Sequence, residues 1–496
     1  MYLGIDLGTS SVKALLVDDE QRVVSEASSP VAIARPHALW SEQSPADWWN
    51  ATTDAVGRLR ASDAKAFSGV RAIGLSGQMH GATLLDEHQR VLRPAILWND
   101  GRSHAECREL EAREPRAREI TGNAAMPGFT APKLLWVARH EPEVFSRIAH
   151  VLLPKDWLRL QLSGDFASDA SDASGTLWLD VARRGWSEEM LAACGLSTAM
   201  MPRVVDGSQP TGVLRREIAN TWGLSRPPVL AGGGGDNAAG AAGVGVIRPG
   251  QALLSLGTSG VVFLVTEHFA PNPAQGVHAF CHCLPLTWHQ MSVMLSAASC
   301  LSWLSSVTGA GSEAALLAEV ERSPAKPSPV LFLPYLSGER TPHNDPQAQG
   351  VFFGLTHDTS RADLTRAVLE GVAFGFSEGL AALREAGGVP REITVIGGGS
   401  RSALWIRILA SALGETLLLR DHAEVGPAFG AARLARLAVT GEPPEVACVA
   451  PRVILQVEPD HALREHYGRR IAQYRGLYPL LRPLYAQQPA AGSGAA

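Results

Sequence analysis

The residues best able to do chemistry lie near the middle of the chain, where an aspartate follows four glycines: Gly232-Gly233-Gly234-Gly235-Asp236. Glycine has no side chain, so such a run lets backbone and ligand approach closely and permits positive φ angles. A carboxylate at the end of the run is placed to accept a proton from a bound hydroxyl group. The alternative is an ordinary turn in which Asp236 caps a helix over residues 238–242. Other motifs must decide between these two interpretations.

Two related turns offer backbone N–H groups and small hydroxyl side chains: Gly8-Thr9-Ser10 and Gly257-Thr258-Ser259. Each turn lies between two apolar segments that read as strands. The repeat of strand, Leu-Gly-Thr-Ser and strand predicts a duplicated domain with a cleft between the copies, and coincidence of a short string is the alternative. Concave turns of this kind bind phosphate oxygens through main-chain donors.

A third glycine-rich unit follows the strand predicted at residues 393–396. It consists of Gly397-Gly398-Gly399 and a helix that begins at Ser402. With the two turns it indicates a site for ATP, although the chain has no P-loop motif. Asp6 lies in an apolar strand ahead of the first turn, where a charge is costly unless it is paired or binds a cation. Mg²⁺ beside a nucleotide phosphate is the natural partner, and a hydrogen bond to its own turn is the alternative.

These groups must be positioned by a larger scaffold. Strands alternate with segments of helical pattern, and consecutive early strands are joined by turns, which predicts an α/β fold with mixed sheets. Helices are expected at residues 131–139, 187–193, 402–413, 429–439 (opened by Glu424-Val425-Gly426-Pro427-Ala428) and 461–478. We predict an N-terminal domain over residues 1–245, a C-terminal domain over residues 246–482, and a disordered tail over residues 483–496.

Bulk properties narrow the class of protein. The chain has 496 residues, 46% of them hydrophobic and 19% charged, as in a globular protein. A net charge of −5 argues against nucleic acid as a partner, and no apolar stretch predicts a membrane span or a secretory signal. The 6 scattered cysteines suit a reducing, cytoplasmic environment. We interpret Cys281-His282-Cys283 as ordinary strand residues rather than a metal site.

Gly4-Ile5-Asp6-Leu7-Gly8-Thr9-Ser10 resembles the first phosphate motif of sugar kinases that share the actin, hexokinase and 70-kDa chaperone ATPase fold. Residues 128–136 and residues 350–370 are similar to the two signatures of one such family, the FGGY carbohydrate kinases. The resemblance extends from residue 1 to about residue 480. It implies two actin-like (ribonuclease H-like) domains, with ATP and Mg²⁺ as co-substrate and cofactor.

Within that family, residues 40–43, 77–81, 98–102 and 336–343 are similar to the branch that phosphorylates the 5-hydroxyl of D-xylulose. The resemblance makes Asp236 the proton acceptor and places Asp6 at the metal. It puts four further residues at the sugar: Met79, His80, Asp100 and Asn237. It arranges eight residues around the nucleotide: Gly8, Thr9, Ser10, Gly257, Thr258, Gly398, Gly399 and Ser402.

Several alternatives remain open at this stage. His80 could be a structural residue, and Trp48, Trp49 and Trp98 are interpreted as core packing rather than sugar platforms. The polar residues between Asp169 and Thr176 are interpreted as turn hydrogen bonding. The branch has three glycines before its aspartate, so we expect the extra glycine to form a bulge. A kinase for L-ribulose, glycerol or gluconate, or a non-catalytic ATP-dependent switch, would share most of these features, and the family also suggests a homodimer.

Overall fold

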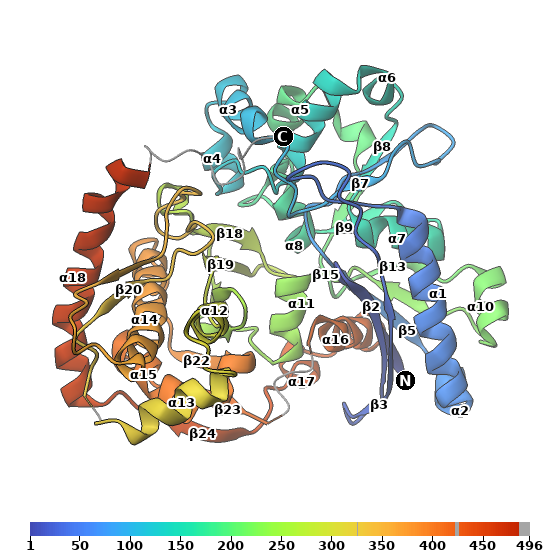
Figure 1. Cartoon of the computed structure of the whole chain (residues 1–496). Helices are drawn as coiled ribbons and strands as arrows, with labels where there is room; N and C mark the ends of the chain where they lie inside the picture. Colours follow the sequence, from blue (N-terminus) through green and yellow to red (C-terminus); the bar gives the residue numbers. More distant parts are fainter. Residues whose placement is uncertain (325, 422–425, 486–496) are drawn as a thin grey trace.

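The computed structural model describes residues 1–324, 326–421 and 426–485. The chain forms two α/β halves that lie side by side, the N-terminal half on the right of Figure 1 and the C-terminal half on the left. Each half contains a seven-stranded mixed sheet with helices against it. The predicted α/β class with mixed sheets is therefore confirmed.

The two sheets have the same layout, as the repeated motif predicted. The first follows the order β13-β14-β5-β1-β2-β3, and the second the order β24-β23-β22-β16-β17-β19, with β18 beyond β19. In both sheets a hairpin, β1–β2 in the first and β16–β17 in the second, is antiparallel. The first strand of each hairpin also pairs in parallel with the strand on its other side, β5 in the first sheet and β22 in the second. The first sheet contains β1 (Tyr2–Leu7), β2 (Ser11–Val17), β3 (Val23–Pro30), β5 (Ala72–Gly77), β13 (Pro210–Val213), β14 (Val229–Ala231) and β15 (Gly234–Gly235). The second contains β16 (Gln251–Leu256), β17 (Gly260–Thr266), β18 (His278–Cys281), β19 (Trp288–Met294), β22 (Glu392–Ile396), β23 (Leu417–Arg420) and β24 (Val453–Val457).

Two helices join the halves. α11 (Asp236–Gly243) follows β15, and α16 (Gly426–Thr440) packs both on α11 and on β1 and β5 of the first sheet. A Cβ on Gly4 would lie 1.9 Å from the carbonyl oxygen of Ala428, and one on Gly430 would lie 1.7 Å from that of Ala239. Glycine is required at both positions because a side chain would collide with the backbone of the neighbouring helix, α16 at Gly4 and α11 at Gly430. Because α16 crosses to the first sheet, the boundary near residue 245 stays a prediction.

Helices also cover the outer faces of the sheets, which explains why the central strands are apolar along their whole length. α1 (Pro45–Ser62) packs on β2 and β3, and α14 (Arg361–Glu385) packs on β17 and β19. β1 has no exposed polar face, since nearly all its residues are buried. The ends of β1, β5, β16 and β22 therefore carry the site, because turns and loops leave the packed core there.

Most predicted helices appear within one or two residues of their expected ends: α5 (Thr130–His140), α9 (Glu188–Ala193) and α15 (Ala403–Leu413). The terminal helix is longer than predicted, because α18 (His461–Tyr485) continues to Tyr485, whose ring is buried against the core. The expectation of disorder from residue 483 is thus wrong for its first three residues. The rest of that tail, 486–496, lies outside the described residues, as do Glu424 and Val425.

The remaining elements complete the two halves. The helices are α2 (Ala64–Ser68), α3 (His104–Arg113), α4 (Ala117–Thr121), α6 (Pro142–Phe145), α7 (Pro154–Ser163), α8 (Ala170–Ala173), α10 (Arg216–Trp222), α12 (Ser299–Thr308), α13 (Glu313–Arg322) and α17 (Pro444–Ala447). The short strands are β4 (Glu42–Gln43), β6 (Thr83–Leu85), β7 (Ala95–Ile96), β8 (His150–Leu152), β9 (Ala167–Asp169), β10 (Leu179–Asp180), β11 (Gly185–Trp186), β12 (Arg203–Val205), β20 (Leu331–Leu333) and β21 (Val351–Phe353). None of the helices described is both long and apolar enough to cross a bilayer.

Candidate active site

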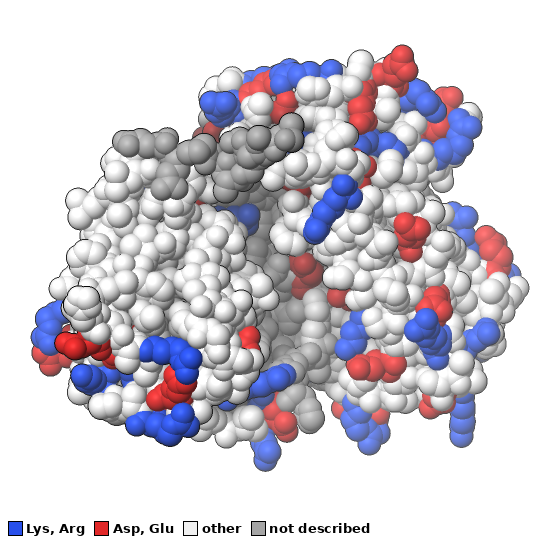
Figure 2. All heavy atoms as spheres, viewed as in Figure 1, with Lys and Arg blue, Asp and Glu red and all other residues white. Residues whose placement is uncertain are grey.

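Three cavities meet in series where the two halves face each other, and Figure 2 shows this face of the molecule hollowed between them. The inner cavity has a volume of about 170 Å³, the central cavity about 250 Å³ and the outer cavity about 550 Å³. Asp236, Asn237 and Val261 line both the inner and the central cavities. Trp98 and Arg340 line both the central and the outer cavities. The central cavity thus has Asp236 at one end and Arg340 at the other.

The glycine run before Asp236 contains a one-residue bulge. Leu230 pairs with Ile73 of β5, and Gly234 pairs with Ser76, so residues 231, 232 and 233 lie opposite only residues 74 and 75. Gly233 has a φ of +80°, and a Cβ there would lie 2.2 Å from the carbonyl oxygen of Leu75. The extra residue is absorbed before β15, which confirms the predicted bulge and leaves Asp236 directly after a paired strand.

The Asp236 carboxylate is half-buried at the start of α11. Gly235, not Asp236, occupies the N-cap position, so the capping alternative is wrong. One carboxylate oxygen, Oδ1, accepts hydrogen bonds from the backbone N–H of Asn237 at 2.7 Å and from its side-chain amide at 2.9 Å. Burial raises the pKa of Asp236 to about 6, despite these two hydrogen bonds. The group is therefore ionised at neutral pH, but it is a stronger base than an exposed aspartate.

Asp6 lies close enough to Asp236 for the two charges to interact. It is the second-last residue of β1 and lies opposite Lys13 of β2 and Ser76 of β5. Burial, and then the negative charge of Asp236, raise the pKa of Asp6 to about 7. Its Oδ1 is buried and has no hydrogen-bond partner among the described residues. Such an orphaned acceptor fits a hard cation, whereas Lys13 forms an ion pair with Glu26 at 2.8 Å and leaves Asp6 largely uncompensated.

The predicted nucleotide residues of the C-terminal half are close in the chain to residues that line the inner and central cavities, such as Ile396 at the end of β22, which lines the inner one. Gly257 and Thr258 form the β16–β17 turn, and the next residue, Ser259, lines the central cavity. Gly397 and Gly399 rest against Leu256, since a Cβ on either would lie within 2.7 Å of its atoms, while Gly398 has open space around it. Ser402 begins α15 as its N-cap, where its hydroxyl accepts a hydrogen bond from the N–H of Trp405 at 3.2 Å.

The first turn contacts Trp98, a residue of the N-terminal half that lines the central cavity. Gly8 donates its N–H to the carbonyl of Ser11 at 3.0 Å, which closes the tight turn around Thr9 and Ser10. The hydroxyl of Thr9 accepts a hydrogen bond from Trp98 Nε1 at 3.0 Å. Its carbonyl accepts another from Gln43 at 2.7 Å. The turn is therefore fixed at its hydroxyl and its carbonyl side before any ligand binds.

Met79 and His80 line the central cavity beside Asp236, as predicted. His80 has a φ of +69°, a conformation that non-glycine residues seldom adopt. Its Nδ1–H donates to the carbonyl of Gly175 at 2.7 Å, and its own carbonyl accepts from Lys133 Nζ at 2.9 Å. Burial, and then the charge of Lys133, lower the pKa of His80 to about 3, so the ring stays neutral. Because Nδ1 carries the proton, Nε2 is left as an acceptor for a substrate hydroxyl.

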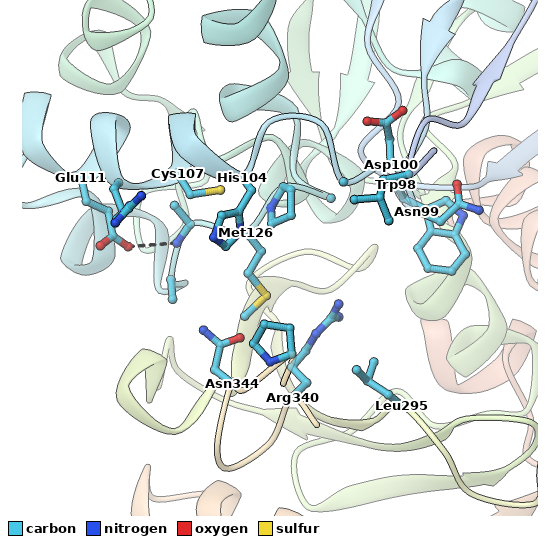
Figure 3. Close-up of a pocket in the computed structure, with 18 of the residues that line it drawn as sticks. Trp98, Asn99, Asp100, His104, Cys107, Glu111, Met126, Leu295, Arg340 and Asn344 are labelled. Carbon is cyan, nitrogen blue, oxygen red and sulfur yellow. Dashed lines mark hydrogen bonds between the residues drawn. The ribbon is translucent and has the colours of Figure 1, made fainter. Parts of the chain in front are cut away.

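Asp100 does not offer its side chain to the cavity, which corrects its assignment as a sugar contact. Its carboxylate is fully buried and accepts two hydrogen bonds from the Arg102 guanidinium, at 2.9 and 2.7 Å. It also accepts from the backbone N–H of Ser41 at 2.6 Å. Figure 3 shows the carboxylate turned away from the outer cavity that the backbone of this segment lines. With its acceptor sites occupied, Asp100 shapes the segment after Trp98 rather than binding sugar.

The aromatic predictions hold only in part. Trp48 is fully buried and donates to Gln43 Oε1 at 2.9 Å, so it belongs to the core. Trp98 is 46% exposed and lines both the central and the outer cavities, so its interpretation as core packing is wrong. The preceding strand ends before Trp98, and the ring therefore projects from a loop instead of from a packed face.

The polar segment near Asp169 is more than the turn that was predicted. Asp169 does accept from the backbone N–H groups of Ser171 and Asp172, which caps α8. It also contacts Lys155 Nζ at 2.7 Å in a fully buried ion cluster that includes Asp156 and Asp172. Ser171 in turn accepts from the N–H of Gly235 at 3.1 Å. The cluster thus supports the strand that presents Asp236.

Sequence reasoning missed several residues of the central cavity, among them His278, Phe280 and Arg340. Arg340 belongs to a segment that carried the family resemblance, but nothing in its local sequence gave it a role. His278 and Phe280 alternate along β18, which points their side chains to one face of the strand. Only the pairing of distant segments brings that face to the cavity.

Residues 1–243 match the N-terminal domain of the FGGY family of carbohydrate kinases, and residues 252–439 match its C-terminal domain. The chain belongs to this family and is a carbohydrate kinase, as its sequence motifs predicted. Membership implies ATP as the phosphoryl donor.

Individual relatives are similar over almost their whole length. The xylulose kinase of Escherichia coli K12 is 54% identical over 488 residues, which cover 98% of this chain and all of that protein. A crystal structure described as a xyloylose kinase from Brucella ovis is 52% identical, with a TM-score of 0.95 over 97% of this chain and 99% of that one. The crystal structure of xylulose kinase from Rhodospirillum rubrum is 30% identical, with a TM-score of 0.91 over 98% of this chain and all of that one.

Proposed function

We propose that this protein transfers the γ-phosphoryl group of ATP to the 5-hydroxyl of D-xylulose. The observation that carries the proposal is the central cavity itself, which brings the Asp236 carboxylate and the His80 ring together in a space of about 250 Å³. That space suits a small polyhydroxylated molecule. The identity of more than half the residues with a xylulose kinase over nearly the full chain supports the choice of acceptor.

Asp236 is the proposed general base. Its Oδ1 is held by Asn237, so Oδ2 is left to face the cavity and accept the proton of the attacking hydroxyl. The raised pKa strengthens the base without protonating it at neutral pH. Met79 packs against Gly235, where a Cβ would lie 3.0 Å from its sulfur, and this contact limits how far the Asp236 loop can move.

The nucleotide is proposed to lie along the inner cavity between the glycine turns of the two halves. Gly8, Thr9, Ser10, Gly257 and Thr258 would offer backbone N–H groups to the phosphates, with Gly398 and Gly399 on the other side of the second turn. The unpartnered Oδ1 of Asp6 fits Mg²⁺, directly or through a water molecule. When bound, Mg²⁺ supplies neutralisation of charge on the phosphate oxygens. Asp6 itself then holds the cation at the edge of the sugar site.

The acceptor is tested by measuring ADP release with D-xylulose, L-ribulose, glycerol and gluconate in parallel. We expect the highest kcat/KM with D-xylulose. A higher value with another acceptor would replace D-xylulose in this proposal while leaving the kinase assignment intact. Release of ADP that no acceptor stimulates would instead favour an ATP-dependent switch.

Two finer expectations accompany this function. We propose a homodimer, because β24 is an edge strand whose Ile454 and Leu455 are 56% and 45% exposed. Light scattering coupled to size-exclusion chromatography would test this directly.

We also infer a cytoplasmic enzyme, since ATP is available there and all 6 cysteines are buried and unpaired, as in a reducing compartment.

A further inference from the structure

Arg340 occupies the junction between the central and outer cavities. It lies in the loop after Tyr335, which belongs to the C-terminal half, and lines both cavities. Figure 3 shows its side chain extending from that loop toward the segment that carries Trp98. Among the described residues no carboxylate forms an ion pair with it, although the adjacent Glu339 accepts from its backbone N–H at 2.8 Å. A cation left without an anion at the wall of a ligand cavity has unused hydrogen-bonding capacity.

The guanidinium is held in place without being neutralised. Arg340 Nη1 lies 3.3 Å from His278 Nε2, and His278 Nδ1 lies 2.9 Å from Asn123 Oδ1. The amide of Asn123 is oriented by its donation to the carbonyls of Thr121 and Ala279. Because Asn123 Oδ1 must accept, His278 carries its proton on Nδ1 and accepts from Arg340 at Nε2. This contact uses one of the five N–H donors of Arg340 and fixes the direction of the rest.

The chemistry of the acceptor says what such donors would meet. In a pentulose the 5-hydroxyl is the group that closes the five-membered ring on carbon 2. A sugar whose 5-hydroxyl is free to be phosphorylated is therefore in its open-chain form, with a free carbonyl at carbon 2. A carbonyl oxygen accepts hydrogen bonds and donates none, so it can be recognised only by a hydrogen-bond donor. Arginine is such a partner, since it has five donors and no acceptor.

The two ends of the central cavity match the two ends of that chain. Asp236 is shared with the inner cavity, on the side of the glycine turns, and Arg340 is shared with the outer cavity. A ketose with its 5-hydroxyl at Asp236 directs carbons 1 and 2 toward Arg340. His80, which offers an acceptor at Nε2, suits a hydroxyl and not the carbonyl.

We propose that Arg340 is a specificity residue that recognises the carbonyl end of an open-chain ketose by donating hydrogen bonds to its oxygen atoms. This inference rests on the proposed function. It differs from that function in assigning the recognition of the unreactive end of the substrate to the C-terminal half. The sugar is then bound by both halves, and a shorter acceptor loses the contact with one of them.

The test is a comparison of two substrates in three variants. D-Xylulose has oxygen atoms on carbons 1 and 2, whereas the pentane-1,2,3-triol of matching configuration keeps the reacting end and lacks both. We expect Arg340→Met to lower kcat/KM for D-xylulose by about 10- to 100-fold, the usual effect of removing a charged donor. The same substitution should leave the triol unchanged within about twofold, whether it is measured as a substrate or as a competitive inhibitor. Equal losses with both compounds, or no loss with either, would overturn the inference.

Two further variants keep the result interpretable. Arg340→Lys retains a cation and covers the case in which the Met variant does not fold. It should lower kcat/KM for D-xylulose at least about threefold and leave kcat/KM for the triol unchanged, because a single ammonium does not reproduce the planar guanidinium fork. Parity of the Lys variant with wild type would count against the inference. Arg108→Met is the matched control, since Arg108 is an exposed arginine of the outer cavity alone, and no change is expected. If wild type itself does not phosphorylate D-xylulose, the proposed function fails first, and a failure confined to Arg340 leaves that function standing.

Discussion

Replacement of Asp236 by asparagine should remove catalysis and at the same time stabilise the fold. Asparagine has the shape of the carboxylate and keeps an oxygen that can accept both hydrogen bonds from Asn237. It cannot take a proton from the substrate, so we expect kcat to fall by about 10²- to 10⁴-fold, the usual contribution of a general base. ATP should still bind, because the glycine turns are unchanged.

The stabilisation follows from the raised pKa of Asp236. The ordinary aspartate pKa of 3.8 rises to about 6 on folding, because burial disfavours the charged form. One pKa unit corresponds to about 1.4 kcal/mol, so the ionised group costs the folded protein at most about 3 kcal/mol above pH 6. Since part of the carboxylate faces water, we expect the variant to gain about 1–2 kcal/mol at pH 8. Loss of this charge should also lower the pKa of Asp6, which the charge helps to raise.

The pH dependence has a definite sign. Between its ordinary pKa and about 6, Asp236 is protonated in the folded chain and ionised in the unfolded one. Wild type therefore loses stability as the pH rises through this window, and the Asp236→Asn variant does not. The difference in unfolding free energy should be largest at pH 8, smaller at pH 5 and absent near pH 3. Wild-type kcat/KM should fall tenfold for each pH unit below about 6.

Coupled measurement of ADP release and denaturant unfolding at pH 8 and pH 5 would check both effects in one preparation. Asp363→Asn is the control of opposite sign, because Ser360 donates to that carboxylate at 2.6 Å and lowers its pKa. The control should lose stability at pH 8 and keep full activity. An Asp236→Asn protein that keeps more than about a tenth of wild-type kcat, with Asp236→Ala used to exclude deamidation, would refute the assignment of the base. Destabilisation of Asp236→Asn at pH 8 would refute the electrostatic reasoning.

Three further changes test the parts around the base. Lys133→Met removes the donor to the His80 carbonyl. Steady-state kinetics should then show a KM for the sugar that is raised about tenfold, with a smaller change in kcat. An unchanged KM would contradict the positioning role of Lys133. Gly233→Ala places a Cβ within 2.2 Å of the Leu75 carbonyl oxygen at a residue with positive φ. Denaturant unfolding should therefore show that the free energy of unfolding falls by more than about 2 kcal/mol. Wild-type stability would mean that the bulge relaxes freely. Asp6→Asn should raise the Mg²⁺ concentration needed for half-maximal activity by about tenfold or more. Calorimetry should show that sugar binding is unchanged. The same Mg²⁺ dependence as wild type would exclude Asp6 from the metal site.

The sequence was sufficient for features that depend on short segments. Gly8-Thr9-Ser10 and Gly257-Thr258-Ser259 repeat the same strand–turn–strand pattern, and the two sheets indeed share one layout. The bulge before Asp236 was predicted because this chain has four glycines where the related branch has three, and glycine adopts the positive φ that such a bulge requires. Helix ends were predicted to within a few residues because they too depend on short segments, except that the terminal helix continues through its prolines.

Tertiary structure alone decided which side chains share a cavity and which are used up elsewhere. Arg340 and Trp98 are far apart in the chain, and only the docking of the two halves makes them neighbours in one cavity wall. Asp100 has the chemistry of a sugar ligand, but Arg102 and the Ser41 N–H occupy its oxygens. The number of donors and acceptors that remain free on a residue depends on every segment packed around it. The sequence by itself therefore determined the backbone motifs and the acid, whereas the partners of each polar side chain, and with them the wall of the central cavity at Arg340, were set by packing.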